Sequence, residues 1–600
     1  MTRNELESQY LADAGKYSER AATESRTLLL LSFLRLAVFI TGIFLAWFTA
    51  ARAALSGSAL LVLDIIVFLI LLKRFSVHTD RKEYYSNLEH INRDEARAVV
   101  GDFSMFGNGS EYARRDHDFS YDLDLFGDAS LFQFLNRTCT GYGSDKLAEW
   151  LSDPLPNSAL FEARQKLVRE LSQKKSWRHD FSATGRNRSL DKNHISGLSG
   201  WLEKEDFVSS SSFLTAIIKI MPALAILSLI LLCAGIISYL FFLIIVLIDS
   251  MIIFFNLRRS NAIHEELTGK YLFLDSMSEL FRLIEDEPFD SLLLNSMKSG
   301  TVEGTGPAAR SLRELGRIIR AFDGRLNIMA GLVLNGIFLW DLYCIRRLEK
   351  WKARYREQFP LWLDMAGQID AFSSLGNYAY NNSAFTFPVI SDDGKPFSAK
   401  ELGHPLIEDE KRVCNDFELP GKGKICIISG ANMAGKSTFL RSVAVNHILA
   451  MTGAPVCSSA MSFLPVSLFT SMRTTDSLST GESYFYAELK RLKSLEQKIE
   501  SGADILFILD EILKGTNSDD KSQGSGLFLR HLIELGATGL IATHDTSLGT
   551  LEKEYTGVIL NKCIEVEIDG ENIIFDYKLR EGIASKKNAV ILMKKMGIIP

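Results

Sequence analysis

Four almost wholly apolar runs stand out from the otherwise mixed pattern of hydrophobic and polar positions along the chain. They come in two pairs: Leu28 to Ala50 with Leu55 to Leu72, and Phe213 to Ala234 with Ile236 to Phe255. A helix that spans a bilayer needs about 20 mostly apolar residues. Each pair therefore predicts a helical hairpin that crosses a membrane and returns.

Basic residues at the ends of these pairs predict their orientation. Lys73 and Arg74 follow the first pair, and Arg258 and Arg259 follow the second. Such residues mark the cytoplasmic side of a membrane protein. The sequence thus predicts an integral membrane protein whose remaining regions face the cytoplasm.

Three polar or short features leave alternatives open. Arg35 interrupts the first run, so a pair of buried core helices remains the alternative for that hairpin. Asp64 and Asp249 lie within apolar runs, where an acid either marks an ion path or pairs with a base inside the bundle. The stretch Ile328 to Leu339 is too short to span and predicts a buried helix.

The regions outside the apolar runs have helical periodicity up to about residue 385 and alternate strands with helices after residue 421. A basic stretch, Arg310 to Arg356, is either a nucleic-acid surface or a solvated helix face, and its interleaved acids favour the second. The predicted divisions are a cytosolic segment (1–26), a first transmembrane hairpin (27–73), a helical domain (74–212), a second hairpin (213–256), a helical lever-like region (257–400) and an α/β domain (401–600).

The first strand of the α/β region, Lys424 to Ser429, leads into a glycine-rich loop and then into a helical pattern. The loop reads GANMAGKST, from Gly430 through Gly435 to Thr438. Strand, GxxxxGKS and helix together are typical of a loop whose backbone amides surround nucleotide phosphates. In this interpretation Lys436 reaches the β- and γ-phosphates of ATP, and the Ser437 hydroxyl binds Mg²⁺.

Two further buried strands end in residues with matching chemistry. Asp504 to Leu509 precedes Asp510 and Glu511, and Thr538 to Ala542 precedes Thr543 and His544. We expect Asp510 to hold Mg²⁺, Glu511 to orient or deprotonate the attacking water, and His544 to sense the γ-phosphate. The sequence therefore predicts a P-loop ATPase of the ABC type in this region.

Composition adds two constraints. The net charge is −6, so any contact with nucleic acid has to come from a local basic patch. The seven cysteines are scattered without a CxxC pair or a Cys/His cluster, which argues against a disulfide framework and a zinc site and fits a reducing compartment.

These motifs resemble the MutS family. Asn432 and Met433 within the phosphate loop match the family form GxNMxGKST, with Ala431 and Ala434 in place of its proline and glycine. The stretch TTDSLSTGESYFYAEL resembles the family loop whose serine reaches the nucleotide of the other subunit, and Ser483 aligns with that serine better than Ser479 does. DEI followed by KGTNS, and the tail REGIASK, are similar to other family segments.

The resemblance extends upstream, with informative departures. DLDLF from Asp122, HPL from His404 and Asn415-Asp416 are similar to family segments, whereas membrane hairpins stand where the mismatch-reading and clamp domains would be. Arg412 occupies the position of an aromatic that stacks on adenine in the family.

The resemblance implies a dimer that hydrolyses ATP with Mg²⁺. Its nucleotide-binding residues would be Gly430, Asn432, Met433, Gly435, Lys436, Ser437 and Thr438, with Ser483 of the second subunit. Binding of mismatched or branched DNA is a further implication of the family. The alternatives are half of an ABC-type transporter, or a nucleotide-gated membrane scaffold that does not act on DNA.

Overall fold

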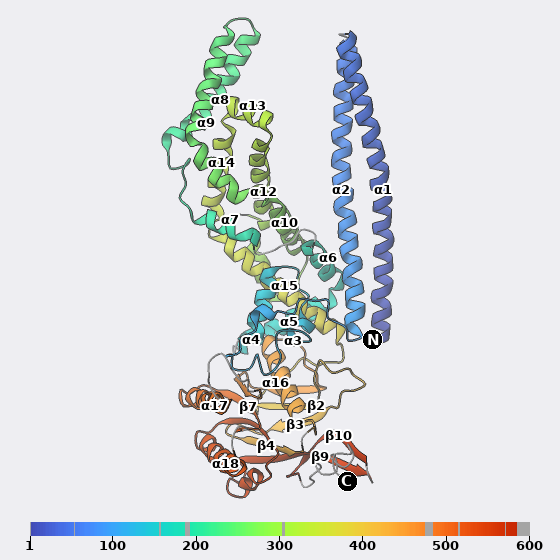
Figure 1. The fold of residues 1–600 in the computed structure, drawn as a ribbon, viewed down its shortest axis with the longest axis vertical. Helices are drawn as coiled ribbons and strands as arrows, with labels where there is room; N and C mark the ends of the chain where they lie inside the picture. The colour runs from blue at the N-terminus through green and yellow to red at the C-terminus, as the bar shows by residue number, and fades with distance from the viewer. Residues whose placement is uncertain are drawn as a thin grey trace.

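The computed structural model describes nine stretches of the chain: residues 2–52, 55–154, 158–186, 193–302, 306–431, 433–473, 484–513, 517–569 and 572–584. The molecule is elongated, with a sheet domain at one end and two helical arms directed toward the other (Figure 1). Its lower helices lie on the sheet domain and connect it to both arms.

The first arm consists of α1 (Arg3–Arg52) and α2 (Leu55–Val99), which lie side by side over much of their length (Figure 1). Thr41 Oγ1 donates a hydrogen bond to Asp64 Oδ1 at 2.9 Å, so Asp64 has a partner on the neighbouring helix. Both predicted apolar runs of this hairpin therefore belong to one continuous two-helix arm.

Polar side chains fix the base of this arm to the helical core. Tyr10 Oη donates to Asn381 Oδ1 at 2.7 Å, and Asn381 Nδ2 donates to Glu95 Oε2 at 2.8 Å. Glu95 also pairs with Arg137. Because Glu95 and Tyr10 are buried, this network joins α1, α2 and the core where water is excluded.

The helical core consists of short helices packed around one long, largely buried helix, α15 (Gln358–Asn381). Asp370 on α15 accepts hydrogen bonds from the backbone amide of Thr140 at 2.8 Å and from its hydroxyl at 2.6 Å. Thr140 in turn caps α4 by accepting from Gly143 N. The other helices of this region are η1 (Ser110–Tyr112), α3 (Leu131–Leu135), α4 (Gly141–Ser152), α5 (Ser158–Gln173), α6 (Lys175–Arg186), α7 (Asn193–Glu203), α10 (Tyr271–Asp286) and α11 (Leu292–Val302).

The second arm contains α8 (Ser212–Cys233) and α9 (Tyr239–Leu267), with α13 (Ile328–Phe338) packed against both (Figure 1). Beside the second arm lie α12 (Ala308–Asp323), η2 (Gly324–Leu326) and α14 (Trp340–Tyr355), and both α12 and α14 contact α9 (Figure 1). Ser211 and Ser238 cap the starts of α8 and α9 with their side chains. The turn between α8 and α9 lies at the same end of the molecule as the end of α1 and the start of α2 (Figure 1). Both apolar hairpins thus point away from the sheet domain.

Among the described residues, three helices are long and apolar enough to cross a membrane: Arg3–Thr49, Ser212–Cys233 and Tyr239–Leu267. The bent pair Met329–Phe338 with Trp340–Tyr355 passes the same test only when counted together, across a bend of 75°. The apolar start of α2 is not in this set. The prediction of a helix near Ile328 to Leu339 is confirmed, but its predicted burial is wrong, since Met329, Leu332 and Val333 are exposed.

The basic stretch after residue 310 is neutralised in part by nearby acids. Arg313 pairs with Glu279 at 2.6 Å, and Arg320 pairs with Asp275. Both pairs join α12 to α10. This arrangement fits the solvated helix face better than a nucleic-acid surface.

The sheet domain is built on a six-stranded sheet in the order β10-β9-β4-β8-β7-β6, with all neighbours parallel except β9 and β10. The central strands are buried along their whole length, which explains their continuous apolar runs. These strands are β4 (Ile425–Gly430), β6 (Ser467–Ser471), β7 (Ile505–Asp510), β8 (Thr538–Thr543), β9 (Ile559–Asp569) and β10 (Asn572–Glu581). The connecting helices are α16 (Lys436–Thr452), α17 (Tyr484–Glu500), α18 (Ser518–Glu534) and η3 (Leu548–Lys553).

A second, four-stranded sheet in the order β1-β5-β2-β3 lies next to it. Its strands are β1 (Val389–Ile390), β2 (Phe397–Leu402), β3 (Asn415–Leu419) and β5 (Ala460–Phe463). One buried apolar cluster runs from the core helices into both sheets and includes Phe372, Leu440 and Ile428. The helical core and the sheet domain therefore share a hydrophobic interior.

Two acids of the DLDLF segment fasten the helical core to the sheet domain. The buried Asp122 carboxylate accepts from Thr470 Oγ1 at 2.7 Å and from the amides of Met472 and Arg473 at 3.1 Å each. Asp124 pairs with Arg473 and, at 3.2 Å, with Arg441 on α16. The DLDLF segment thus contacts both α16 and the chain that leaves β6.

Candidate nucleotide-binding site

The loop between β4 and α16 has the backbone geometry that its glycines predict. Gly435 has φ of 99°, and a Cβ there would lie 2.8 Å from Tyr577 Cδ1. At Gly430 a Cβ would lie 2.5 Å from the Ile564 carbonyl oxygen, so neither position has room for a side chain. Met433 has φ of 68° and is exposed.

Lys436 opens α16 with its side chain folded back over this loop. Its Nζ donates to the carbonyl oxygens of Gly430 at 2.7 Å and Ala431 at 2.9 Å. The residue is buried. An ammonium group is therefore held at the start of a helix, where the helix dipole also favours an anion.

Ser437 and Asp510 meet across the site. The Ser437 hydroxyl donates to Asp510 Oδ2 at 2.5 Å, which joins the first turn of α16 to the end of β7. Hydroxyl and carboxylate oxygens are ligand types that Mg²⁺ prefers. This pair therefore fits a magnesium site without rearrangement of the backbone.

Glu511 and His544 lie next to this pair because β4, β7 and β8 are parallel and end at one edge of the sheet. His544 Nδ1 is 3.3 Å from Glu511 Oε1. Glu511 has φ of 54°, and its amide donates to the Ala542 carbonyl at 2.9 Å, which fixes its backbone against β8. A carboxylate and an imidazole are thus held side by side beside the predicted phosphate position.

Lys436, Ser437, Thr438 and Glu511 line a pocket of about 480 Å³. The rest of its lining includes groups that the strand-end motifs did not reveal: Leu402, His404, Ile407, Lys411, Val413, Asn415 and Tyr577. The volume is within the range of small-ligand sites in proteins.

Tyr577 is the exposed aromatic ring of this pocket. It lies in β10 with φ of 54°, is 43% exposed, and stacks on Phe575 with ring centroids 6.1 Å apart. Asn415 Nδ2 donates to the Tyr577 carbonyl at 3.0 Å and holds that strand against β3. The only sequence signal for Tyr577 was its place just before the REGIASK tail.

His404 lines the pocket with an uncharged imidazole ring. Burial lowers its pKa to about 4, and the nearby Arg441 and Arg412 guanidinium groups act in the same direction. Its imidazole is therefore uncharged at neutral pH. An uncharged ring in the wall adds no positive charge beside an adenine base.

Arg412, which replaces the family's stacking aromatic, does not line the pocket. Its guanidinium donates to the carbonyl oxygens of Ile407 and His404 and pairs with Asp409 at 2.8 Å. It thereby fixes the loop of residues 404–412, which carries Ile407 and Lys411 into the pocket wall. Replacement of the aromatic at this position leaves Tyr577 as the exposed ring.

The same loop contacts the base of the first arm. Arg3, at the start of α1, donates to Asp409 through Nε at 2.6 Å and Nη2 at 3.0 Å, and to the Val99 carbonyl at 3.2 Å. Val99 ends α2. Arg3 therefore connects both ends of the hairpin arm to a wall of the pocket.

Some predicted residues lie outside the part of the chain that the structure describes. They are Asn432, Ser483 with residues 474–482 before it, residues 514–516, and residues 585–600. Of the tail, Ala584 is described, and its amide donates to Ser429 Oγ at 2.8 Å at the end of β4. The predicted role of Ser483 in a second subunit stays a prediction.

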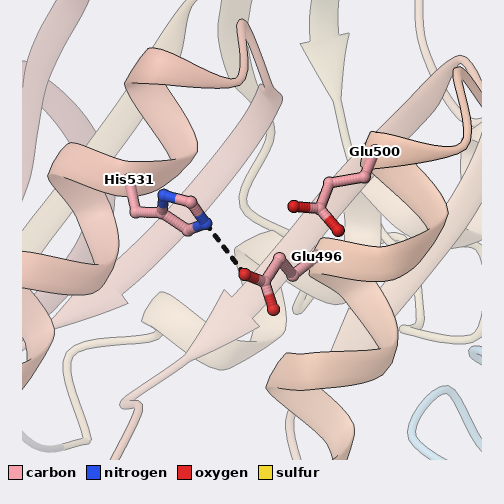
Figure 2. Close-up of side chains that lie close together, drawn as sticks. All are labelled: Glu496, Glu500 and His531. Atoms are coloured by element: carbon pink, nitrogen blue, oxygen red, sulfur yellow. Dashed lines mark hydrogen bonds and ion pairs between the residues drawn. The ribbon is translucent and has the colours of Figure 1, made fainter.

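A separate group of titratable side chains joins α17 to α18: Glu496, Glu500 and His531 (Figure 2). His531 Nε2 is 2.9 Å from Glu496 Oε1, and Lys493 Nζ is 2.5 Å from the other oxygen of that carboxylate. Both oxygens of Glu496 thus already have cationic or hydrogen-bonding neighbours. The group acts as an ion-pair contact between these two helices.

Comparison with known proteins agrees with the motifs in this site. Residues 426–600 match MutS domain V, and residues 117–197 match MutS domain III. A DNA mismatch repair protein MutS of Thermotoga maritima is 34% identical over 237 residues, which cover 38% of this chain and 29% of the relative. The MutS of Acetivibrio thermocellus is 35% identical over 238 residues (38% and 27%), and that of Listeria monocytogenes is 30% identical over 243 residues (39% and 28%).

The matched region thus spans less than a third of the length of these curated relatives. The site residues Lys436, Ser437, Asp510, Glu511 and His544 all lie within the segment that matches domain V. The second matching segment contains Asp122 and Asp124, which fasten the core to the sheet domain. The similarity to the MutS family thus rests on these two segments, which contain the site residues and the contact between the helical core and the sheet domain.

Proposed function

We propose that this chain is a membrane-anchored ATPase that binds ATP and Mg²⁺ in the pocket between β4 and α16 and works as a dimer. One observation carries the proposal: Lys436, Ser437 and Glu511 line one pocket at the edge of the sheet, and Asp510 and His544 contact Ser437 and Glu511 there. A site that only filled a hydrophobic core would not need these five polar groups in one place.

Each group has a defined task in hydrolysis. Lys436 Nζ would exchange the carbonyl oxygens of Gly430 and Ala431 for phosphate oxygens. Ser437 and Asp510 would hold Mg²⁺, which supplies charge neutralisation between the β- and γ-phosphates when bound. Glu511 would accept the proton of the attacking water, and His544, 3.3 Å away, would orient that carboxylate and contact the γ-phosphate.

The arms give the ATPase cycle a mechanical output. Arg3 and Asp409 link the pocket wall to the first arm, and Asp122 and Asp124 link the core to the end of β6 and to α16. A change of the pocket on nucleotide binding would therefore reach both the arm and the core. The apolar ends of the two arms, on the side of the molecule remote from the pocket, support anchoring in a bilayer (Figure 1).

DNA binding is the second part of the proposal, and the names of the relatives support it. The first test is ATP turnover by the full chain in lipid nanodiscs, with and without duplex and branched DNA at two salt concentrations. Stimulation that weakens as salt rises would support contact with DNA phosphates. Turnover unchanged by every DNA would contradict that part and direct attention to membrane or protein partners.

The role of Glu511 separates an ATPase from a nucleotide-gated scaffold. We expect Glu511→Gln to abolish most turnover while ATP binding persists, because the amide keeps the size of the side chain but cannot accept the proton. Loss of one general base typically costs about 10²- to 10⁴-fold in rate. The matched control is Glu534→Gln at an exposed position on α18, which should keep full turnover. Equal turnover in wild type and Glu511→Gln would contradict the assignment.

A further inference from the structure

We infer that α13 is a re-entrant membrane helix, which enters the lipid layer beside α9 and turns back at Leu339 without crossing. This inference rests on the proposed membrane anchoring. It concerns a lipid-facing surface in the second half of the chain, separate from the four apolar runs.

The depth of α13 follows from its contact with α9. A Cβ at Gly336 would lie 3.2 Å from Val246 Cγ1, so the two helices are in close contact there. Val246 lies inside the apolar run of α9, between the exposed residues Ile244 and Leu247. If lipid covers α9 at that level, the outer face of α13 lies at the same level.

That outer face is apolar. Met329, Leu332 and Val333 are spaced as neighbours on one side of a helix and are 74%, 68% and 56% exposed. Gly331 lies on the opposite side, buried against the chain around Arg325, and Gly336, one to two turns further along the exposed side, is buried where α13 meets α9. Lipid chains are the partner that this chemistry fits, because the exposed faces of α8, α9 and α13 are apolar together.

The helix is also too short to cross. Its 11 residues span roughly 16 Å at 1.5 Å per residue, about half of a 30 Å hydrocarbon core. Leu339 has φ of 48° and ψ of 46°, and the chain bends by 75° into α14. A segment of this length with a sharp break returns to the side from which it entered.

Several polar groups at the break have partners within the protein, which lowers the cost of placing them at membrane depth. Asn335 Nδ2 donates to Asp341 Oδ1 at 3.1 Å, and the Asp341 amide donates to Asn335 Oδ1 at 3.0 Å. Asp341, fully buried, also pairs with Arg325 at 3.1 Å. These contacts keep two charges and the open helix ends away from lipid.

The residues after the break are those of a membrane–water boundary. Trp340 and Tyr343 stack with ring centroids 5.6 Å apart, and Trp340 Nε1 donates to the Ala321 carbonyl at 2.8 Å. Amphipathic aromatic rings collect at this boundary. The basic residues Arg346, Arg347 and Lys350 follow further along α14, in the direction of α15 and the helical core.

Photo-crosslinking tests this inference on the full chain in nanodiscs of phosphatidylcholine and phosphatidylglycerol with alkyne-tagged acyl chains. Benzoylphenylalanine replaces Leu332, Ile244 or Leu361, one at a time. Leu361 on α15 is 67% exposed and so matches Leu332 in residue type and exposure, but it lies in the helical core. Ile244 on α9 reports on membrane anchoring itself.

We expect at least about tenfold more lipid adduct at Leu332 than at Leu361, and a yield at Leu332 similar to that at Ile244, since acyl chains are confined to the hydrocarbon core. Lipid adduct at Ile244 with none at Leu332, or a protein–protein adduct between two copies at Leu332, would overturn the inference and leave membrane anchoring intact. Absence of lipid adduct at both Ile244 and Leu332 would overturn both.

Discussion

Tyr577 shows how one residue can compensate for another at a distant position. The loop of residues 404–412 carries Arg412 where the family has a stacking aromatic, and Arg412 is used to fix the loop itself. Tyr577 reaches the same pocket from β10 and packs over Gly435. If this pocket binds ATP as proposed, the exposed ring of Tyr577 is suited to stack on the purine.

Tyr577→Ala should therefore weaken ATP binding, whereas Tyr577→Phe should not. Stacking of an aromatic ring on a base contributes about 1–3 kcal/mol, so we expect a rise in Kd of roughly 5- to 150-fold for the alanine variant. Titration with a fluorescent ATP analogue measures this, and inorganic triphosphate provides the comparison because it lacks the base. An equal loss of affinity for triphosphate would mean that the change had disturbed the phosphate loop instead.

His447, buried in α16, links stability of the sheet domain to pH. Burial lowers its pKa to about 4, while Nε2 contacts the Val466 carbonyl at 2.8 Å. In the unfolded chain a histidine has a pKa of about 6.5, so between those values the unfolded state binds the additional proton. The free energy of unfolding therefore decreases as pH falls from 6.5 toward 4. The decrease due to His447 is about 3 kcal/mol at most, and above pH 6.5 there is none.

We expect His447→Gln to reduce the fall in thermal midpoint between pH 7 and pH 5, because glutamine can donate to Val466 but does not titrate. The measurement is scanning fluorimetry of the full chain in nanodiscs at both pH values. His90→Gln, at an exposed position on α2, is the control and should follow wild type. Identical pH dependence in wild type and His447→Gln would exclude this histidine as the cause.

At the scale of elements, the contact between the helical core and the sheet domain depends on a few carboxylates. Asp122 satisfies a hydroxyl and two amides at the exit of β6, and Asp124 reaches α16 and Arg473. The exit of β6 leads toward residues 474–483, the segment that contains Ser483. Movement of the core would therefore act on that segment directly.

Asp122→Ala should loosen this contact. Two of the three donors to Asp122, Thr470 Oγ1 and the Met472 amide, are in buried bonds. Unsatisfied buried donors cost about 1–3 kcal/mol each, so we expect a local loss of about 2–6 kcal/mol. Hydrogen exchange at the amides of Met472 and Arg473 measures the effect and should accelerate strongly. Asp128→Ala, exposed on the same segment, should leave both rates unchanged, and unchanged rates in Asp122→Ala as well would refute the assigned role.

At the scale of the whole molecule, the open question is whether each nucleotide site uses two subunits. If Ser483 acts on the partner's nucleotide, a mixed dimer of Ser483→Ala and Glu511→Gln subunits contains one site with both groups intact. The mixture of the two variants should then hydrolyse ATP faster than the sum of the rates that the two variants show when measured separately. If Ser483 acts within its own subunit, both sites of the mixed dimer are damaged and turnover stays at that sum.

The chemistry of the strand ends was determined by the sequence, because it is encoded within short, local segments. A buried strand followed by GANMAGKST, or by Asp510 and Glu511, specifies its own turn and its own side chains. Parallel strands then necessarily bring those ends to one edge. The signal for the apolar hairpins is equally local in the sequence, since the length and composition of each apolar run suffice to predict a helix.

The other wall of the pocket and the environment of α13 were decided only by tertiary structure. Tyr577, His404 and the Arg3–Asp409 contact join segments far apart in the chain, and nothing in the periodicity of either segment indicates its partner. For α13, hydrophobic residues at Met329, Leu332 and Val333 fit a protein core and a lipid layer equally well. Periodicity reports that a face is apolar, but only the packing of the chain decides what covers it.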